Sequence, residues 1–199
     1  MEFTKTRTIQ LTSYLLLGLV MTQAVYTALY VAQINVPRQL LWGLEGLLFT
    51  TLIVFAGTAM LQAKNHHVGW VAIAFSAVLN VVQVSVGVTL FEPFGEAAGQ
   101  VEALAPTAGA VVAFSFMIYN AAKFLLGFAA LIFGLVKKNA GAKMLGGLTA
   151  LVGAVAMIAN ALLIVFGRDG FLQPSVAGAT GVFATLLLAL CLMSIAQED

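Results

Sequence analysis

Two charged residues stand inside apolar stretches of this sequence, and they are its strongest candidates for chemistry. Lys123 lies within "NAAKFLLGFAALIFG", residues 120–134, and Glu45 lies within "LEGLLFTTLIVFAG", which begins at Leu44. A charged side chain at membrane depth costs about 2.5–3.5 kcal/mol on insertion scales and almost always faces the interior of a helix bundle. A lysine and a glutamate at similar depth can pair with each other or hold a ligand between them.

Three interpretations of Lys123 follow from this placement. Lys123 and Glu45 form a structural ion pair that orients two helices, or they form a site for a small polar or anionic ligand in the outer half of the membrane. In the third interpretation, burial keeps the lysine uncharged. If the helix is displaced outward, Glu102 replaces Glu45 as the partner. The other residues of the predicted ligand-binding site are Asn120, Tyr119, Gln83, Asn80, Asn160, Tyr26 and Tyr30.

Motifs for catalysis, metal binding or cofactor binding are not found in the sequence. His66 and His67 are adjacent in a predicted loop, so two transmembrane histidines cannot ligate haem. The two aspartates, Asp169 and Asp199, lie outside the apolar segments, which excludes a paired-aspartate metal site within the membrane. The single cysteine, Cys191, excludes an internal disulfide and a cysteine-rich metal site. We therefore expect no catalytic residue, metal or cofactor, and an enzyme is the least favoured class of function.

The composition places the whole chain in a membrane. Of its 199 residues, 61% are hydrophobic and 9% are charged, and the mean hydropathy is +1.02. A soluble domain carries about 25% charged residues to cover its surface. We therefore expect membrane lipid to surround the protein. The net charge of +1 provides no basic surface that would bind nucleic acid.

Six segments have the length of a membrane span, which is roughly 20 mostly apolar residues. Backbone polar groups cannot stay unpaired in hydrocarbon, so each segment is predicted to be helical. The sequence thus predicts an all-α fold, a polytopic six-helix bundle that forms a single domain over residues 1–199. The predicted helices lie near 11–33, 40–62, 68–91, 109–136, 145–167 and 175–195, with an outer loop at 92–108.

The distribution of Lys and Arg among the short loops predicts the orientation of the bundle. With the N-terminus inside, the inner side holds six basic residues and the outer side holds two, Arg38 and Arg168. The inner residues are Lys5, Arg7, Lys64, Lys137, Lys138 and Lys143. Both termini are therefore predicted to be cytoplasmic. No organelle-targeting segment is visible. We therefore predict a multi-pass protein in the plasma (inner) membrane of a prokaryote.

Small residues repeat at helical spacing and indicate which helix faces meet protein. Without a hydrophobic drive in lipid, helices associate through small residues, close packing and hydrogen bonds. Such stripes occur in four segments: Gly43, Gly46, Thr50 and Gly57; Gly127, Ala130 and Gly134; Gly146, Ala150 and Gly153; and Gly178 and Gly181. The first segment is unusually polar near its end, with Thr22, Gln23, Tyr26, Thr27, Tyr30 and Gln33.

Two classes of function remain open at this point. In the first, the chain is a small transporter, channel or ligand-binding membrane protein with an outward-facing polar pocket around Lys123 and Glu45. In the second, it is an accessory subunit of a larger membrane complex, and the two charges are purely structural. A homo-oligomer or a membrane-protein partner is compatible with either class.

Overall fold

The computed structural model describes residues 3–34, 36–168, 170 and 172–198. These residues form six α-helices and one short 3-10 helix, Glu102–Leu104, and this part of the chain contains no β-strand. The α-helices are α1 (Lys5–Val31), α2 (Arg38–Gln62), α3 (His67–Gln100), α4 (Ala105–Asn139), α5 (Lys143–Phe166) and α6 (Pro174–Glu198). Each is long and apolar enough to cross a membrane, as the sequence predicts.

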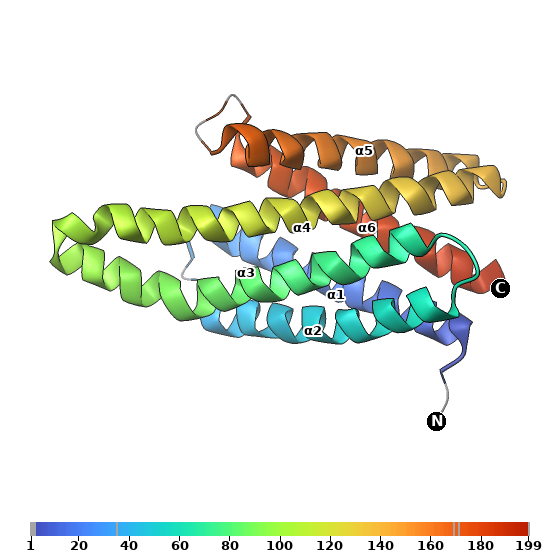
Figure 1. Ribbon diagram of the computed structural model, residues 1–199, viewed down its shortest axis with the longest axis horizontal. Helices are drawn as coiled ribbons and strands as arrows, with labels where there is room; N and C mark the ends of the chain where they lie inside the picture. The colour runs from blue at the N-terminus through green and yellow to red at the C-terminus, as the bar shows by residue number, and fades with distance from the viewer. Residues whose placement is uncertain (1–2, 35, 169, 171, 199) are drawn as a thin grey trace.

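The helices run up and down along one common direction, so the two ends of the bundle differ in what they carry (Figure 1). The N- and C-termini lie at one end with the α2–α3 and α4–α5 turns, and we call this the terminal end. The opposite end holds the α1–α2, α3–α4 and α5–α6 connections, and we call it the hairpin end.

Five of the helices form a closed ring. α1 packs against α2, α2 against α3, α3 against α4, α4 against α6, and α6 against α1. Among the described residues, α5 packs only against α4 and α6, so it lies outside this ring. Side chains that point inward from α1, α2, α4 and α6 therefore meet at the centre of the ring.

The α3–α4 hairpin is longer than the sequence predicts. Instead of an outer loop at 92–108, α3 continues through Pro93 to Gln100, and α4 begins at Ala105. Proline removes one backbone donor, but the residues after Pro93 include the good helix formers Glu96, Ala97 and Ala98. The 34 residues of α3 span about 51 Å at 1.5 Å per residue, against a hydrocarbon core of about 30 Å. The hairpin consequently projects beyond the other helices (Figure 1).

The predicted small-residue stripes of α4 and α5 pack directly against each other. A methyl group added to Gly127 would lie 2.8 Å from the Gly153 carbonyl oxygen, and one added to Gly134 would lie 2.8 Å from the Gly146 carbonyl oxygen. Both contacts are with backbone, so these glycines let the two helices approach more closely than any other residue would allow. On α2, by contrast, a methyl group on Gly43 or Gly57 would have no neighbour within 4 Å.

Most hydroxyl side chains within the helices bond to their own backbone. Thr12 Oγ1 donates to the Thr8 carbonyl at 2.9 Å, and Ser13 Oγ donates to the Ile9 carbonyl at 2.9 Å. This is the usual way in which a helix satisfies Ser and Thr without water. The buried amide side chains cannot satisfy all their polar atoms in this way, and Asn80 Oδ1 and Asn160 Oδ1 have no hydrogen-bond partner among the described residues.

Candidate functional site

Lys123 lies at the centre of the ring. It comes from the middle of α4 and is 0% exposed. Its Nζ donates a hydrogen bond to Gln23 Oε1 of α1 at 2.9 Å, and lies 5.4 Å from the centroid of the Tyr119 ring. Since α1 and α4 do not pack directly against each other in the described structure, the lysine side chain reaches across the ring to its acceptor.

Glycine residues of α6 provide the space for this side chain. A methyl group on Gly181 would lie 2.9 Å from Lys123 Cδ and 3.1 Å from its Cγ. One turn earlier, a methyl group on Gly178 would lie 3.8 Å from the Tyr119 hydroxyl, which is an ordinary contact. The sequence predicts Gly178 and Gly181 as a helix-packing stripe, and in the structure they face Tyr119 and Lys123.

Glu45 approaches the same region from α2 and is 6% exposed. The hydroxyl of Thr22, on α1, lies within hydrogen-bond reach of the Glu45 carboxyl group. The same hydroxyl is 3.0 Å from the Leu19 carbonyl oxygen. A hydroxyl has one proton, so Thr22 can donate to only one of these two acceptors at a time.

Glu45 and Lys123 interact electrostatically without direct contact. The two groups lie within electrostatic range of each other, yet among the described residues no ion pair of 4.0 Å or less joins the carboxylate to Nζ. Lys123 instead donates to Gln23 of α1, and Glu45 lies within reach of Thr22, the residue before Gln23. We call the group Thr22, Gln23, Glu45, Tyr119 and Lys123 the central cluster.

A layer of aromatic rings borders the central cluster on the side of the hairpin end. Tyr26 stacks on Trp42 with centroids 5.5 Å apart, and Trp42 meets Phe91 edge-on at 5.6 Å. Tyr30 continues the stack at 6.4 Å from Tyr26. Tyr26 lies three residues beyond Gln23 on α1, and Trp42 lies three residues before Glu45 on α2, so each is a neighbour on the same helix face. We call Tyr26, Tyr30, Trp42 and Phe91 the aromatic layer.

A cavity of about 1140 Å³ opens at the hairpin end above this layer. Its walls include Tyr30 and Phe91 of the aromatic layer, together with Gly87, Arg38, Glu92 and Glu96. A methyl group on Gly87 would lie 2.6 Å from Trp42 Cζ3, so this glycine is what lets the indole lie flat against α3. Neither Lys123 nor Glu45 lines this cavity.

Three of the predicted site residues lie instead in seams between helices. Asn80 Nδ2 donates to the Ser76 carbonyl at 3.0 Å, and Gln83 Nε2 donates to Ser115 Oγ of α4 at 3.3 Å. Asn160 Nδ2 donates to the Ala156 carbonyl at 2.8 Å and lies 3.4 Å from the Ala177 carbonyl of α6. The contacts of Gln83 and Asn160 favour interhelical hydrogen bonding over cavity lining, whereas Asn80 bonds within α3.

The structure brings together only part of the predicted set. Glu45, Tyr119 and Lys123 belong to the central cluster, and Tyr26 and Tyr30 belong to the aromatic layer. Asn120 is 3% exposed and makes no side-chain hydrogen bond within the described part of the chain. Sequence reasoning did not select Gln23 and Thr22, although the polar character of the first helix was a signal for them.

The fit of Lys123 against Gly181 leads to a stability prediction. Gly181→Ala forces the lysine stem to move, which strains the bond from Nζ to Gln23, and we expect a loss of about 1 kcal/mol in unfolding free energy. Gly178→Ala is the matched control on the same face of α6, and it should be neutral. Unfolding of purified protein by titration with SDS measures both. Equal behaviour of the two variants would contradict the packing described for Lys123.

No family profile, no curated protein and no solved structure matches this chain. The function has to be inferred from the geometry of its own residues.

Proposed function

We propose that this chain is a small membrane transporter or channel that binds a small polar or anionic solute at the central cluster. The observation that carries the proposal is the environment of Lys123. A lysine ammonium has three N–H donors, and among the described residues this fully buried one has a single hydrogen-bond acceptor, Gln23 Oε1. A ligand carboxylate or phosphate beside Lys123 would satisfy the remaining donors.

The separation of the two charges supports a ligand site over a structural pair. A buried ion pair repays its desolvation only with excellent geometry and direct hydrogen bonds. Glu45 and Lys123 lack that contact, so a purely structural pair would be poorly built. Two opposite charges beside the polar residues Thr22 and Gln23 suit a site in which Lys123 and Glu45 change their hydrogen-bond partners when a ligand binds.

The cavity at the hairpin end is the entry route in this proposal. Its mixed charges, Arg38, Glu92 and Glu96, suit a polar solute, and two residues of the aromatic layer, Tyr30 and Phe91, line it. A solute would reach Lys123 when Tyr26 and Trp42 separate. Rings held by stacking contacts, each worth about 0.5–1.5 kcal/mol, can part at a modest cost in free energy.

The second candidate, an accessory subunit, has one observation in its favour. Gly43, Thr50 and Gly57 lie seven residues apart on α2, and a methyl group added to either glycine would have no neighbour within 4 Å among the described residues. Small residues on an open helix face are typical of helix association in membranes. A subunit would bind its partner through this face, and Lys123 would then have only a structural role.

We further propose that the terminal end is cytoplasmic and that the membrane is the plasma membrane of a prokaryote. Of the six basic residues on that side, Lys137 is buried within α4 and not in the predicted loop, which leaves five at the surface. Arg38 and Arg168 are the two at the hairpin end. Five exposed basic residues at the terminal end against two at the hairpin end still favour cytoplasmic termini, because Lys and Arg are in excess on the cytoplasmic side of membrane proteins.

Labelling of single cysteines tests this orientation. Cys191 is buried, and Cys191→Ser removes it as background. In intact cells, a membrane-impermeant maleimide should label Glu96→Cys at the hairpin end and should leave Lys143→Cys at the terminal end unlabelled until the cells are opened. Glu102→Cys is the matched control for Glu96→Cys. The reverse pattern would invert the proposed orientation and place the cavity on the cytoplasmic side.

Native mass spectrometry of protein gently extracted from its own membrane tests the function. Wild-type protein should retain a small molecule of defined mass, and Lys123→Met should lose it while keeping its helical circular dichroism. Lys138→Met is the matched control, because it removes an exposed lysine near the end of the same helix. Retention of the same masses by wild type and Lys123→Met would contradict the proposal. A stoichiometric membrane protein in place of a small molecule would favour the accessory subunit.

A further inference from the structure

A second hollow lies at the terminal end, far from the central cluster. It has a volume of about 290 Å³ and is formed by α1, the α2–α3 turn, α3, α4 and α6. The wall deep in the bundle is apolar and consists of Ile9, Trp70, Phe133, Val136 and Ile195. Trp70 and Phe133 hold each other edge-on at 4.9 Å, so this wall is a packed surface.

The rim of the hollow is basic. Lys5, Lys64 and His66 line it together with the neutral Asn65, and the described lining residues include no acid. All three basic side chains come from segments at the end of a helix, where a bundle meets the headgroup region of a bilayer. A basic rim over an apolar wall matches a molecule that has an anionic head and an apolar body.

The turn that carries Lys64 and His66 has a defined backbone. His66 adopts a left-handed conformation with φ 64° and ψ 28°, which is uncommon for a residue other than glycine. His67 Nδ1 lies 3.1 Å from the Met60 carbonyl oxygen and ties the turn back to α2. α3 then begins without a side-chain cap, so the positive end of its dipole adds to the charge of the rim.

From this arrangement we infer that the terminal-end hollow binds a phosphate group, and that its source is the headgroup of an anionic phospholipid. Basic hollows between transmembrane helices recognise lipid headgroups in this way. Ligand cavities usually measure about 300–1,000 Å³, so a hollow of 290 Å³ is at the small end of this range. We infer that it holds the phosphate and the glycerol of the lipid, while the acyl chains lie outside it against the helices. The same chemistry would bind free inorganic phosphate, which is the other source to test.

Titration of delipidated protein, followed by native mass spectrometry, tests the inference. The probes are phosphatidylglycerol and phosphatidylcholine with identical acyl chains, and inorganic phosphate alone. We expect phosphatidylglycerol to bind more tightly than phosphatidylcholine. Lys64→Gln should weaken the binding of phosphatidylglycerol about fivefold, which is the usual contribution of one lysine at a membrane surface. His66→Asn should weaken it too, because Asn tolerates a left-handed backbone while removing the ring.

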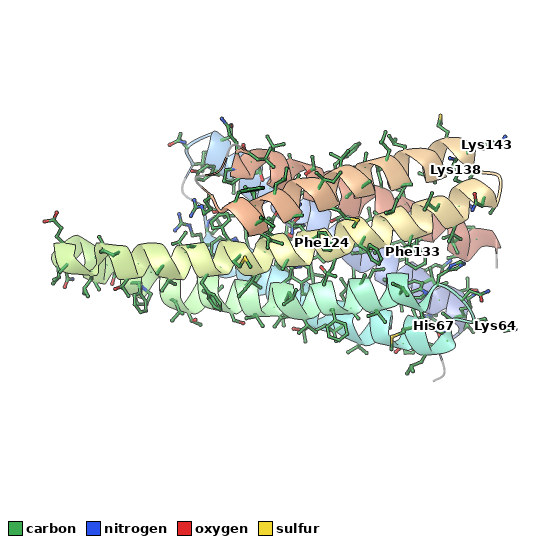
Figure 2. All side chains as sticks on the ribbon, turned by 45° about the horizontal axis from the view of Figure 1, so that its top comes forward. Lys64, His67, Phe124, Phe133, Lys138 and Lys143 are labelled. Carbon is green, nitrogen blue, oxygen red and sulfur yellow. The ribbon has the colours of Figure 1, made fainter. Side chains whose placement is uncertain are left out.

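Lys143→Gln is the matched control, because it removes one exposed lysine from the same end of the bundle. Figure 2 shows Lys143 at the α4–α5 turn and Lys64 at the α2–α3 turn, on separate corners of that end. Equal weakening by Lys143→Gln and Lys64→Gln would mean general attraction to a basic surface and would overturn the inference. Equal binding of the two lipids would overturn it as well. Binding of inorganic phosphate that depends on Lys64, without a preference between the lipids, would keep the phosphate site and overturn the lipid as its source.

Discussion

The Lys123→Met variant is expected to lose about 3 kcal/mol of unfolding free energy, because it leaves Glu45 buried without its countercharge. Methionine matches the length and apolar stem of lysine, so the packing against Gly181 is retained and the loss reports the charge. Gln23 also loses its hydrogen-bond donor. Titration with SDS, followed by circular dichroism, measures the change against wild type.

The double variant Lys123→Met/Glu45→Gln separates stability from function. Removing both charges should restore most of the lost stability, since buried ion pairs replaced by neutral groups of similar volume are often no less stable. The retained small molecule should stay absent from the double variant. If stability and ligand both returned, the ligand would not depend on the two charges, and the central cluster would not be its site. If the single variant were as stable as wild type, the charges of Lys123 and Glu45 would not be coupled as described.

The length and period of the apolar segments were enough to predict the helices. Each observed helix overlaps a predicted one, because a hydrocarbon solvent leaves the backbone little choice but to be helical. The main difference is the stretch from Glu92 to Gln100. Pro93 and the polar residues that follow it suggested a loop, but helix propensity and packing against α4 extend α3 beyond the apolar region.

The central cluster could be predicted only in part, for a geometric reason. Helix periodicity shows that Lys123 and Gly127 share a face, but it does not show which helix lies opposite. The lysine bonds to α1, a helix that is distant in sequence and does not pack on α4, so Gln23 could not be selected from spacing. Asn80, Gln83 and Asn160 lie away from the central cluster, because their amide donors find acceptors within their own helix or on the adjacent one. Helix periodicity does not distinguish such local acceptors from a polar cavity.

Lys137 shows a further limit of sequence reasoning. Its position beside Lys138 after an apolar run predicted a loop residue, yet it lies in the last turns of α4 and is 1% exposed. Basic residues are favourable at the C-terminus of a helix, which explains why α4 includes both lysines. Nothing in the local sequence distinguishes the buried lysine from the exposed one.

The second large effect is expected at the seam between α4 and α5. A methyl group added to Gly134 would lie 2.8 Å from the Gly146 carbonyl oxygen and 2.9 Å from Ala150 Cα. These are backbone atoms, so no side chain can turn aside and the two helices have to separate. We expect Gly134→Ala to cost about 1–3 kcal/mol of unfolding free energy, the usual range for an overpacked core.

Gly147→Ala is the matched control for this prediction. Gly147 lies on α5 one residue after Gly146, but a methyl group there would have no neighbour within 4 Å. Alanine is the better helix former, so the control should be neutral or slightly more stable. SDS titration of both variants decides the point. If Gly134→Ala matched Gly147→Ala, the close approach of α4 and α5 would be wrong, and so would the placement of α5 outside the ring. In that case α4 would be free to rotate, and with it the direction in which Lys123 points.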